Sequence, residues 1–342
     1  MRSHEFATLR VAEVVHETDA AVSIVLDVPQ AARDYFGYQP GQFLTIRREI
    51  GGKFVRRCYS LSSSPDADAR PVITVKRVAE GRVSNDLCSN LHAGDTLDSM
   101  PPSGLFVPKS FDGDFLLFAG GSGITPILSI AKSVLRRGQG KVLIIYANRD
   151  EKSVIFKEVL KQLVQRHEGR LTVIHWLESV QGIPTGSSLR PLIGGWTSAA
   201  AFMCGPQPFM DGVAAMLEQL NFPRAQIHAE RFISLPDEDE AAEPPEATSD
   251  AAVPLTVSID GAVHNLDWPA NAKLLDVMLA AGLDAPFSCR VGGCSTCMCR
   301  VIGGRVEMLR NLVLDARETS DGWVLSCQAM QQGEAVSIEI PS

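Results

Sequence analysis

Four cysteines near the carboxyl end of this 342-residue chain limit its possible folds more than any other feature. Cys289, Cys294 and Cys297 have the spacing C-x4-C-x2-C, and Cys327 follows far downstream. This is the ligand spacing of a plant-type [2Fe–2S] cluster, which is bound by four thiolates. We therefore expect three ligands on one tight loop and the fourth, Cys327, on a return strand.

A zinc site or a set of buried thiols could also account for these cysteines. Zinc sites usually show paired short spacings with a matching second pair, and the sequence has no such pairs. Gly292 and Gly293 would let the loop backbone wrap closely, so that amide groups can point at the sulfurs. Cys299 lies two residues after Cys297, and we expect it to be a small buried apolar residue and not a fifth ligand.

The chemistry of such a cluster implies a second cofactor. A plant-type [2Fe–2S] cluster carries one electron, whereas a nicotinamide dinucleotide releases two electrons together as a hydride. A flavin can accept the pair and release the electrons singly. The cysteine spacing therefore predicts a flavin before any flavin motif is found. Hydride transfer between two rings requires their alignment and demands no catalytic acid or base.

The first hundred residues predict a small antiparallel β-barrel, because short apolar or alternating runs are separated by Gly and Pro. Arg57, Tyr59 and Ser60 follow one predicted strand. An arginine for a phosphate, a tyrosine to stack on a ring and a hydroxyl near its reactive nitrogen suit a flavin. The segment Gly81-Arg82-Val83-Ser84 follows another strand and suits a diphosphate at a turn or helix start. The expected strands are Leu9–Val15, Val22–Val28, Gln42–Ile46, Val55–Ser60, Val72–Val78 and Thr96–Met100.

From Asp114 onward the pattern alternates between strands and helices, which is typical of a doubly wound parallel α/β sheet. The first strand is followed by the segment Gly120–Pro126, in which we expect Thr125 to cap a helix. This glycine-rich turn, with Gly121 and Gly123, lacks the third glycine of the usual dinucleotide fingerprint. Its place between a strand and a helix nevertheless predicts a dinucleotide site. The expected strands are Phe115–Ala119, Val142–Ala147, Leu171–Leu177, Ala200–Met203 and Ile227–Phe232.

Two further segments end strands at the same carboxyl edge of this predicted sheet. Cys204-Gly205-Pro206 follows the fourth strand, although such a tripeptide can also be an ordinary loop. Asn148-Arg149-Asp150 follows the second strand, where an acid favours the ribose diol of NADH and an arginine favours the 2′-phosphate of NADPH. Both residue types are present, so these residues alone do not choose between the two dinucleotides.

The last part of the chain predicts a small α+β domain of ferredoxin type behind a linker. Residues 235–253 are rich in Pro, Ala and acids, with almost no bulky apolar residues, which is typical of a flexible linker. Asp260-Gly261 predicts a hairpin, and Lys273–Ala281 is expected to be helical. We place a flavin domain at 1–108, a nucleotide domain at 109–234, the linker at 235–253 and the cluster domain at 254–342.

Charge and composition exclude some partners. The net charge is −8, and residues 235–253 and 254–342 carry the acidic excess, which argues against nucleic acid as the main partner. No run of apolar residues reaches the length of a membrane span, and the amino terminus has no apolar core of signal-peptide length. We therefore expect a cytoplasmic protein without a membrane span.

Several motifs together resemble the ferredoxin–NADP reductase superfamily. These are Arg57-x-Tyr59-Ser60, Gly81-x-x-Ser84, Gly121-x-Gly123-Ile124-Thr125-Pro126 and Cys204-Gly205-Pro206. The carboxyl-terminal cluster domain narrows the resemblance to reductases of oxygenases. Stretches such as DFLLFAGGSGITP and YANRDEKSVIF look most like the branch that contains the reductases of 3-ketosteroid 9α-hydroxylase and of phenylacetyl-CoA epoxidase, with the first favoured. The similarity covers nearly the whole chain outside the linker.

The resemblance implies a path of electrons from NADH, with NADPH as an alternative, through FAD and the [2Fe–2S] cluster to a Rieske-type terminal oxygenase. It also implies roles for individual residues. Ser60, Cys204 and Glu230 would be the catalytic set, with Thr125 and Cys204 beside the nicotinamide. Arg57, Tyr59, Ser60, Val75, Lys76, Arg77, Glu230 and Phe232 would hold or line the flavin, and Gly81, Arg82, Val83 and Ser84 would bind its diphosphate. Gly121, Gly123, Asn148, Arg149, Gly205 and Pro206 complete the expected nucleotide site.

Two other functions stay open at this point. The acceptor could be a di-iron epoxidase that acts on an aromatic thioester, or the chain could be a redox-sensing module without a committed acceptor. The cysteine loop of this chain differs from that of the reductases it resembles at two positions. Those reductases often have Glu and Gly where this chain has Val291 and Ser295.

Overall fold

The computed structural model describes residues 5–232 and 252–341. These residues pack as two compact units. One unit combines Gly51–Cys58 with the carboxyl-terminal part of the chain, and the other comprises Ala7–Ile50 and Tyr59–Phe232. The linker predicted at 235–253 lies outside the described residues except for its last two positions. Within 5–232 and 252–341, none of the helices combines the length and the apolar composition needed to cross a bilayer.

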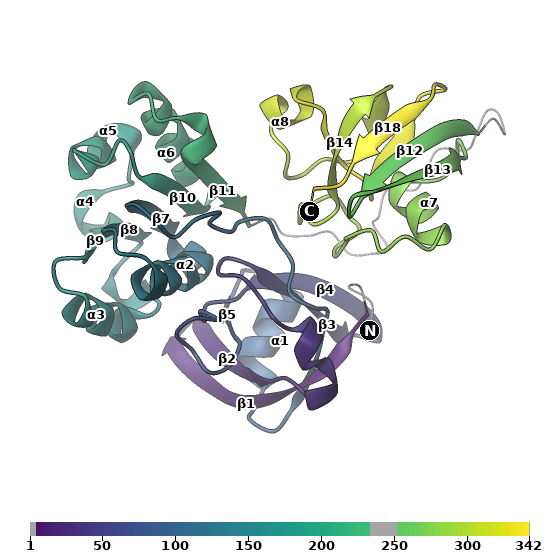
Figure 1. Ribbon diagram of the computed structural model, residues 1–342. Helices are drawn as coiled ribbons and strands as arrows, with labels where there is room; N and C mark the ends of the chain where they lie inside the picture. Colours follow the sequence, from purple (N-terminus) through teal and green to yellow (C-terminus); the bar gives the residue numbers. More distant parts are fainter. Residues whose placement is uncertain (1–4, 233–251, 342) are drawn as a thin grey trace. The chain divides into compact units, whose positions relative to one another are not determined.

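The amino-terminal part folds into one antiparallel sheet of six strands, in the order β4-β3-β6-β1-β2-β5 (Figure 1). Beyond β4, Leu61 forms a single β-bridge with Ile73 and the Ser62 amide donates to the Val72 carbonyl, so the chain approaches β5 without a ladder that closes the sheet. The antiparallel sheet predicted for the flavin domain is confirmed. The strands are β1 (Ala7–Thr18), β2 (Ala21–Asp27), β3 (Phe43–Ile50), β4 (Lys53–Ser60), β5 (Val72–Lys76) and β6 (Thr96–Ser99).

Two helical segments accompany this sheet. The 3-10 helix η1 (Gln30–Tyr35) connects β2 to β3, and α1 (Arg82–Asn90) lies between β5 and β6. The side chains of Val83 and Leu87 on α1 are buried. The sequence predicted only a turn or helix start at this place, since the short apolar stripe of α1 is interrupted by polar residues.

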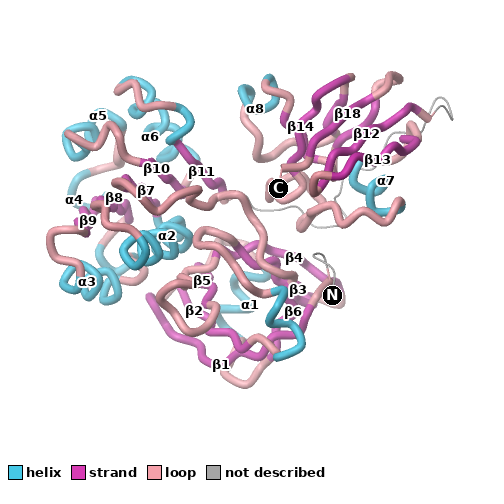
Figure 2. The backbone as a smooth tube through the Cα atoms, in the orientation of Figure 1, coloured by secondary structure: helices cyan, strands magenta, loops and turns pink. Residues whose placement is uncertain are grey.

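The second sheet is parallel throughout, in the order β11-β10-β7-β8-β9, as a doubly wound fold requires. The central strands are buried along their length because helices cover both of their faces (Figure 2). The strands are β7 (Phe115–Gly120), β8 (Val142–Asn148), β9 (Leu171–Leu177), β10 (Ala200–Gly205) and β11 (Ile227–Arg231).

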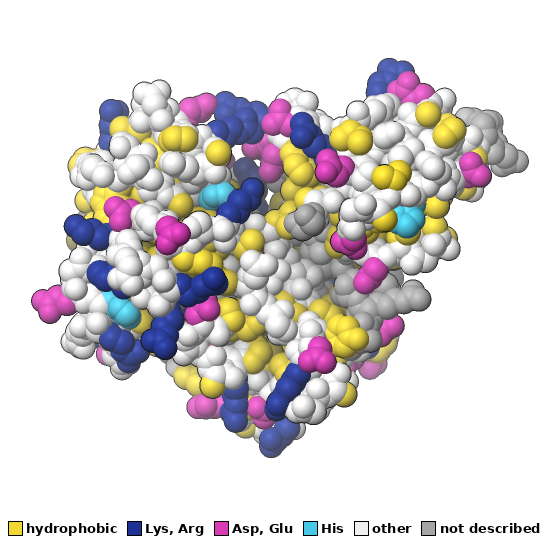
Figure 3. Space-filling model, in the orientation of Figure 1, with side chains coloured by type: hydrophobic (Ala, Val, Ile, Leu, Met, Phe, Trp, Pro, Cys, Tyr) yellow, Lys and Arg dark blue, Asp and Glu magenta, His cyan; other side chains and the backbone are white. Residues whose placement is uncertain are grey.

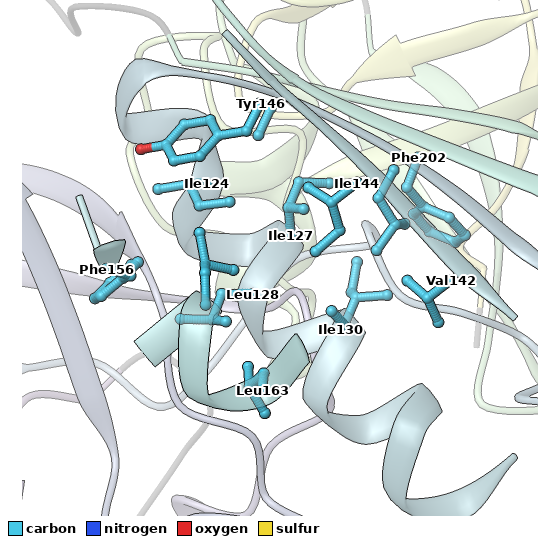
Figure 4. Close-up of a cluster of buried hydrophobic side chains, with 14 of the residues drawn as sticks. Ile124, Ile127, Leu128, Ile130, Val142, Ile144, Tyr146, Phe156, Leu163 and Phe202 are labelled. Carbon is cyan, nitrogen blue, oxygen red and sulfur yellow. The ribbon is translucent and has the colours of Figure 1, made fainter. Parts of the chain in front are cut away.

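Successive residues of these strands point to opposite faces of the sheet, so each strand contributes side chains to two hydrophobic cores. Phe202 and Cys204 of β10 belong to the core under α2 (Ile124–Arg137) and α3 (Lys157–Arg166). Ala201 and Met203 belong to the core under α5 (Gly186–Leu189) and α6 (Gln207–Gln219). Figure 4 shows the first core, in which apolar side chains of α2 meet those of β8 and β10. The short helices of this domain are η2 (Gly121–Gly123), η3 (Glu151–Ser153), α4 (Glu178–Gln181), η4 (Arg190–Ile193) and η5 (Arg224–Gln226).

The start of α2 differs from the prediction. The helix begins at Ile124, with Gly123 as its N-cap residue, because η2 runs directly into it. Thr125 is therefore inside the first turn and not at the N-cap, and its hydroxyl donates to the Ser122 carbonyl at 3.0 Å.

The carboxyl-terminal domain contains a mixed sheet in the order β13-β12-β18-β14-β16 and a two-stranded antiparallel sheet of β15 with β17. The predicted turn at Asp260-Gly261 is confirmed, since both residues have positive φ, of 51° and 76°. Helix α7 (Leu274–Ala280) matches the expected helix. The strands are β12 (Val253–Ile259), β13 (Ala262–Trp268), β14 (Met298–Gly303), β15 (Val306–Met308), β16 (Trp323–Leu325), β17 (Ala329–Gln331) and β18 (Val336–Glu339), and α8 spans Ala316–Ser320.

Cys327 is not on a strand as predicted. It lies in the turn between β16 and β17. Side chains in a strand must point alternately to its two faces, whereas those in a turn are not restricted in this way. The turn therefore allows the Cys327 sulfur to face the loop with the other three cysteines.

Candidate functional site

The first group of expected site residues meets at the carboxyl edge of the parallel sheet. Ser60 is the last residue of β4, and its hydroxyl donates a hydrogen bond to Oε2 of Glu230 on β11 at 3.2 Å. Cys204 on β10 is directly opposite Glu230 in the strand register. The structure therefore brings together the three residues that the sequence predicts as a catalytic set.

The environment of this group favours uncharged side chains. Glu230 is half-buried, and burial raises its pKa to about 8, opposed by the hydrogen bond from Ser60. Cys204 is fully buried; this burial raises the pKa of its thiol well above the ordinary value, and the charge of Glu230 raises it further. At neutral pH a protonated carboxyl group and a neutral thiol lie side by side, so neither supplies a nucleophilic anion.

The residues expected to line a flavin come from β4 and β5, but they do not all point toward one site. Tyr59 and Lys76 are half-buried, and Val75 is buried. Arg57, on β4, donates to the carbonyl of Arg56. The guanidinium of Arg77 is bound to α1, because it donates to the Ser89 hydroxyl at 2.7 Å and to the Cys88 carbonyl at 3.0 Å. Arg77 therefore braces the carboxyl end of α1.

The segment expected to bind a diphosphate forms the start of α1. Gly81 is the N-cap residue, and no side chain caps this end of the helix. A Cβ atom at Gly81 would lie 2.4 Å from the Ser84 hydroxyl and 3.0 Å from the Val78 carbonyl oxygen, so a larger residue would require the Ser84 side chain to move. The Ser84 hydroxyl accepts from the Val78 amide at 3.3 Å and so ties β5 to α1, while Arg82 is exposed and Val83 is buried. Amide groups at the first turn of a helix form an anion site, which fits a flavin diphosphate.

The glycine-rich turn after β7 and the end of β10 are in close contact. A Cβ atom at Gly123 would lie 2.1 Å from the Cys204 carbonyl oxygen, and one at Gly205 would lie 3.0 Å from the backbone of Gly120. Gly121 has a φ of 52°, and a Cβ atom there would lie 3.2 Å from Lys76 Nζ. Pro206 is the N-cap of α6. Gly123 and Gly205 therefore allow the turn after β7 to lie directly against the end of β10. A pyrophosphate site requires a backbone of this kind, without side chains in the way.

A buried polar side chain also indicates a ligand at this edge. Asn148 ends β8 and is buried; its side chain approaches the Tyr146 hydroxyl, but neither Oδ1 nor Nδ2 forms a well-shaped hydrogen bond among the described residues. Buried amides are almost always hydrogen-bonded, so a bound dinucleotide would satisfy this one. Arg149 and Asp150 are exposed, and Oδ1 of Asp150 accepts from the Ser153 amide at 2.9 Å.

Charged side chains gather around the same turn. Burial lowers the pKa of Lys76, the nearby charge of Arg149 lowers it further, and Asp150 opposes both. Lys76 beside Gly121 and the nearby Arg149 supply two cations that fit the phosphates of a dinucleotide. Figure 3 shows Lys and Arg side chains gathered over the part of the surface that carries α2 and α3.

Tyr146 is a site-related residue that the sequence did not reveal. It is fully buried on β8, its hydroxyl donates to the Gly121 carbonyl at 3.1 Å and it accepts from the Ile155 amide at 3.2 Å. It thereby joins the glycine-rich turn to the segment after β8. A tyrosine inside a continuous apolar strand was the available signal, since a buried hydroxyl group needs a partner.

The four predicted cluster ligands converge as two pairs. Cys289 lies within hydrogen-bonding distance of Cys294, which also contacts Cys58, and Cys297 lies within hydrogen-bonding distance of Cys327. Over residues 5–232 and 252–341, no three His, Cys, Asp or Glu side chains are arranged around a single metal ion. Two cysteine pairs suit two irons, each with two thiolates, whereas a structural zinc ion needs four ligands around one point. The donor set therefore fits a [2Fe–2S] cluster better than zinc.

The backbone of the cysteine loop follows an unusual path. Arg290, Gly292 and Ser295 all have positive φ, of 59°, 80° and 56°. Ser295 adopts a backbone conformation that favours glycine. Cys299 is buried on β14.

Three protein families match successive parts of the chain. Residues 8–107 match the oxidoreductase FAD-binding domain family, residues 117–215 the oxidoreductase NAD-binding domain family, and residues 257–332 the 2Fe-2S iron-sulfur cluster binding domain family. All three predicted cofactor types are thereby confirmed, while NADH and NADPH are not distinguished.

Similar proteins cover nearly the whole chain. The ferredoxin reductase component of 3-ketosteroid-9-alpha-monooxygenase from Rhodococcus rhodochrous is 50% identical over 337 residues, which is 97% of this chain and 96% of that protein. The corresponding component from Mycobacterium tuberculosis (strain ATCC 25618 / H37Rv) is 47% identical over 96% of this chain and 94% of that protein. A subunit of 1,2-phenylacetyl-CoA epoxidase from Escherichia coli (strain K12) is 34% identical over 95% of each chain.

Solved structures share the three-domain architecture. Phthalate dioxygenase reductase matches with a TM-score of 0.57 and 24% identity over 98% of both chains. Full-length CYP116B46 from Tepidiphilus thermophilus matches with a TM-score of 0.68 and 25% identity, over 97% of this chain and 42% of that longer one. Taken with the relatives at 47% to 50% identity, these matches show that the chain belongs to the ferredoxin reductase components of monooxygenases, oxidoreductases that combine FAD-binding, NAD-binding and [2Fe–2S] domains in one chain.

Proposed function

We propose that this reductase component supplies electrons from NADH to a Rieske-type terminal oxygenase that hydroxylates a 3-ketosteroid at the 9α position. The identity of 50% to the Rhodococcus rhodochrous component carries this proposal, because it exceeds the 34% identity to the epoxidase subunit over a similar length. We also propose that the protein works in the cytoplasm and that its domains span 1–108, 109–234 and 254–342.

The bound groups supply the redox chemistry: a flavin takes a hydride from reduced nicotinamide, and a [2Fe–2S] cluster carries single electrons. The residues of the chain would bind and align them. Arg57 and Tyr59 would hold the flavin, with Val75 and Lys76 lining it, and the first turn of α1 would bind its diphosphate. Ser60 and Glu230 would hold a proton between them at the carboxyl edge of the sheet, since the raised pKa keeps Glu230 protonated at neutral pH.

The nucleotide would lie across the glycine-rich turn. Gly121 and Gly123 allow close approach of the pyrophosphate, Asn148 offers a buried amide, and Arg149 offers a cation. Cys204 and Thr125 would lie beside the nicotinamide, where the small neutral thiol excludes water without reacting. Phe232 follows β11 and is exposed, and it would cover the flavin. We propose Cys289, Cys294, Cys297 and Cys327 as the cluster ligands.

Reconstitution tests the acceptor. The purified reductase is combined with the terminal oxygenase of a 3-ketosteroid-9-alpha-monooxygenase or with the remaining subunits of a 1,2-phenylacetyl-CoA epoxidase, and product formation is compared at equal reductase concentration. We expect steroid hydroxylation to be coupled to NADH oxidation. Efficient turnover with the epoxidase alone would contradict the proposal. Faster turnover with NADPH than with NADH would contradict the choice of dinucleotide.

Rapid mixing with NADH separates this function from redox sensing. We expect fast flavin bleaching followed by reduction of the cluster, as an electron carrier requires. Cys204→Ala should slow the bleaching while flavin and iron contents stay unchanged. Loss of flavin from that variant would count against the place given to Cys204.

A further inference from the structure

Gln328 follows the ligand Cys327, and its side chain is completely buried between the turn and the cysteine loop. Its Nε2 donates to the Arg290 carbonyl at 2.9 Å and to the Cys327 carbonyl at 2.7 Å, and it lies 3.5 Å from Cys327 Sγ. Arg290 directly follows the ligand Cys289. One amide group therefore contacts the residue after the first ligand and also the fourth ligand itself.

The orientation of this amide is determined by its surroundings. Three acceptors surround Nε2, so exchange of the nitrogen and oxygen atoms would place the amide oxygen against two carbonyl oxygens and a sulfur. Oε1 has no hydrogen-bond partner among the described residues. Burial of an amide oxygen without a hydrogen-bond partner costs free energy. The side chain keeps this orientation although Oε1 is unsatisfied, which indicates that the hydrogen bonds donated by Nε2 determine its position.

The loop backbone is shaped to accept this side chain. Gly292 has a φ of 80°, and a Cβ atom there would lie 3.1 Å from Cγ of Gln328 and 2.9 Å from the Arg310 carbonyl oxygen. The backbone of Gln328 is also held, because its amide donates to Leu325 and its carbonyl accepts from Leu309. Gln328 is therefore fixed at both its backbone and its side chain.

We infer that Gln328 is a positioning residue for the [2Fe–2S] cluster, which locks the three-cysteine loop to the turn of the fourth ligand and donates to the Cys327 sulfur. The inference rests on the proposed ligand set. Two consequences follow from the two contacts. Loss of the Arg290 contact loosens the loop and speeds release of iron. Loss of the donor near sulfur lowers the reduction potential, because hydrogen bonds to cluster sulfurs stabilise the more negative reduced state.

The test compares Gln328→Met, which removes the amide at similar volume, with Gln331→Met in the full-length holoprotein. Gln331 is also largely buried and lies on β17, and its Oε1 accepts from the Gly333 amide at 2.6 Å. The measurements are the reduction potential of the cluster, the EPR signal after reduction, and the rate of iron loss to a chelator. A second variant, Gln328→Glu, keeps the length and shape of the side chain while replacing the donor with an acceptor.

We expect both Gln328 variants to have a lower cluster potential, a changed EPR signal and faster iron loss than Gln331→Met, with unchanged bleaching of the flavin by NADH. Complete loss of the cluster from the Gln328 variants alone would also support the inference. Equal behaviour of the variants at the two positions, including equal loss of the cluster, would overturn it. If the unsubstituted protein has no [2Fe–2S] signal, the proposed ligand set itself fails.

Discussion

Ser60 and Glu230 are 170 positions apart in the sequence, yet the Ser60 hydroxyl donates to Glu230 Oε2 at 3.2 Å. One residue ends the barrel strand β4 and the other lies on the edge strand of the parallel sheet. This hydrogen bond places the end of the expected flavin strand at the carboxyl edge where the nucleotide is expected. Both residues belong to one compact unit, so its packing would align the two rings if the cofactors bind where we propose.

The raised pKa of Glu230, to about 8, predicts a loss of stability with rising pH. The unfolded chain releases this proton near the ordinary value of 4.5, whereas the folded protein keeps it until about pH 8. Stability from this group is thus complete below pH 4.5 and falls as pH rises to about 8. Glu230→Gln should unfold at the same temperature as the unsubstituted protein near pH 5 and be more stable by about 1 kcal/mol at pH 8.5. Equal stability of the two proteins at pH 8.5 would refute the shift.

Tyr146→Phe removes a hydroxyl that holds the Gly121 carbonyl and the Ile155 amide. One net hydrogen bond is worth about 1 kcal/mol, which corresponds to about a fivefold change in an equilibrium constant. We expect KM for NADH to rise by about this factor, while kcat changes less, because the hydroxyl acts on the turn and not on the flavin. Steady-state kinetics with a small artificial acceptor measures both constants. A fall in kcat at constant KM would show a different role.

The helix α2 is attached to the barrel by serines. The Ser129 hydroxyl donates to the Ser63 carbonyl at 2.6 Å, and the hydroxyls of Ser64 and Ser133 are 2.7 Å apart, all in buried positions. Ser129→Ala leaves the buried Ser63 carbonyl without this donor, which costs about 1–3 kcal/mol. We expect a lower Tm and slower flavin reduction by NADH. The exposed Ser110→Ala variant is the control and should change neither quantity.

Ser295 adopts a φ of 56°, which favours glycine. Ser295→Gly should relieve strain of about 1 kcal/mol in the loop and slow the loss of iron to a chelator. The opposite change at a neighbouring position, Gly292→Ala, should speed this loss, because a Cβ atom would lie 2.9 Å from the Arg310 carbonyl oxygen. If the two substitutions change iron loss in the same direction, backbone strain does not control this loop.

Local patterns were enough to predict most of the fold. The apolar run from Phe115 and the alternation of strands and helices after it identify the parallel sheet, because buried parallel strands need continuous apolar residues. The spacing of Cys289, Cys294 and Cys297 identifies the cluster loop for a similar reason, since ligand geometry restricts the sequence locally.

Features that depend on tertiary contacts were harder to predict. Thr125 is a good N-cap residue by type, but the preceding 3-10 turn moves the N-cap two residues earlier, to Gly123. Cys327 was placed on a strand because the turn between β16 and β17 has no Gly or Pro to signal it. Arg77 was assigned to the flavin, and its guanidinium is bound to α1. In each case the position of the residue depends on a contact with another segment, and residue type alone does not predict that contact.

The most direct test of the account is anaerobic addition of NADH to the unsubstituted protein and to Cys327→Ser, with flavin absorbance and EPR followed together. We expect NADH to bleach the flavin in both proteins. Only the unsubstituted protein should develop the signal of a reduced [2Fe–2S] cluster, and electron output should collapse in the variant. An unsubstituted protein that contains zinc or no metal in place of iron, or a Cys327→Ser variant with full electron output, would contradict it.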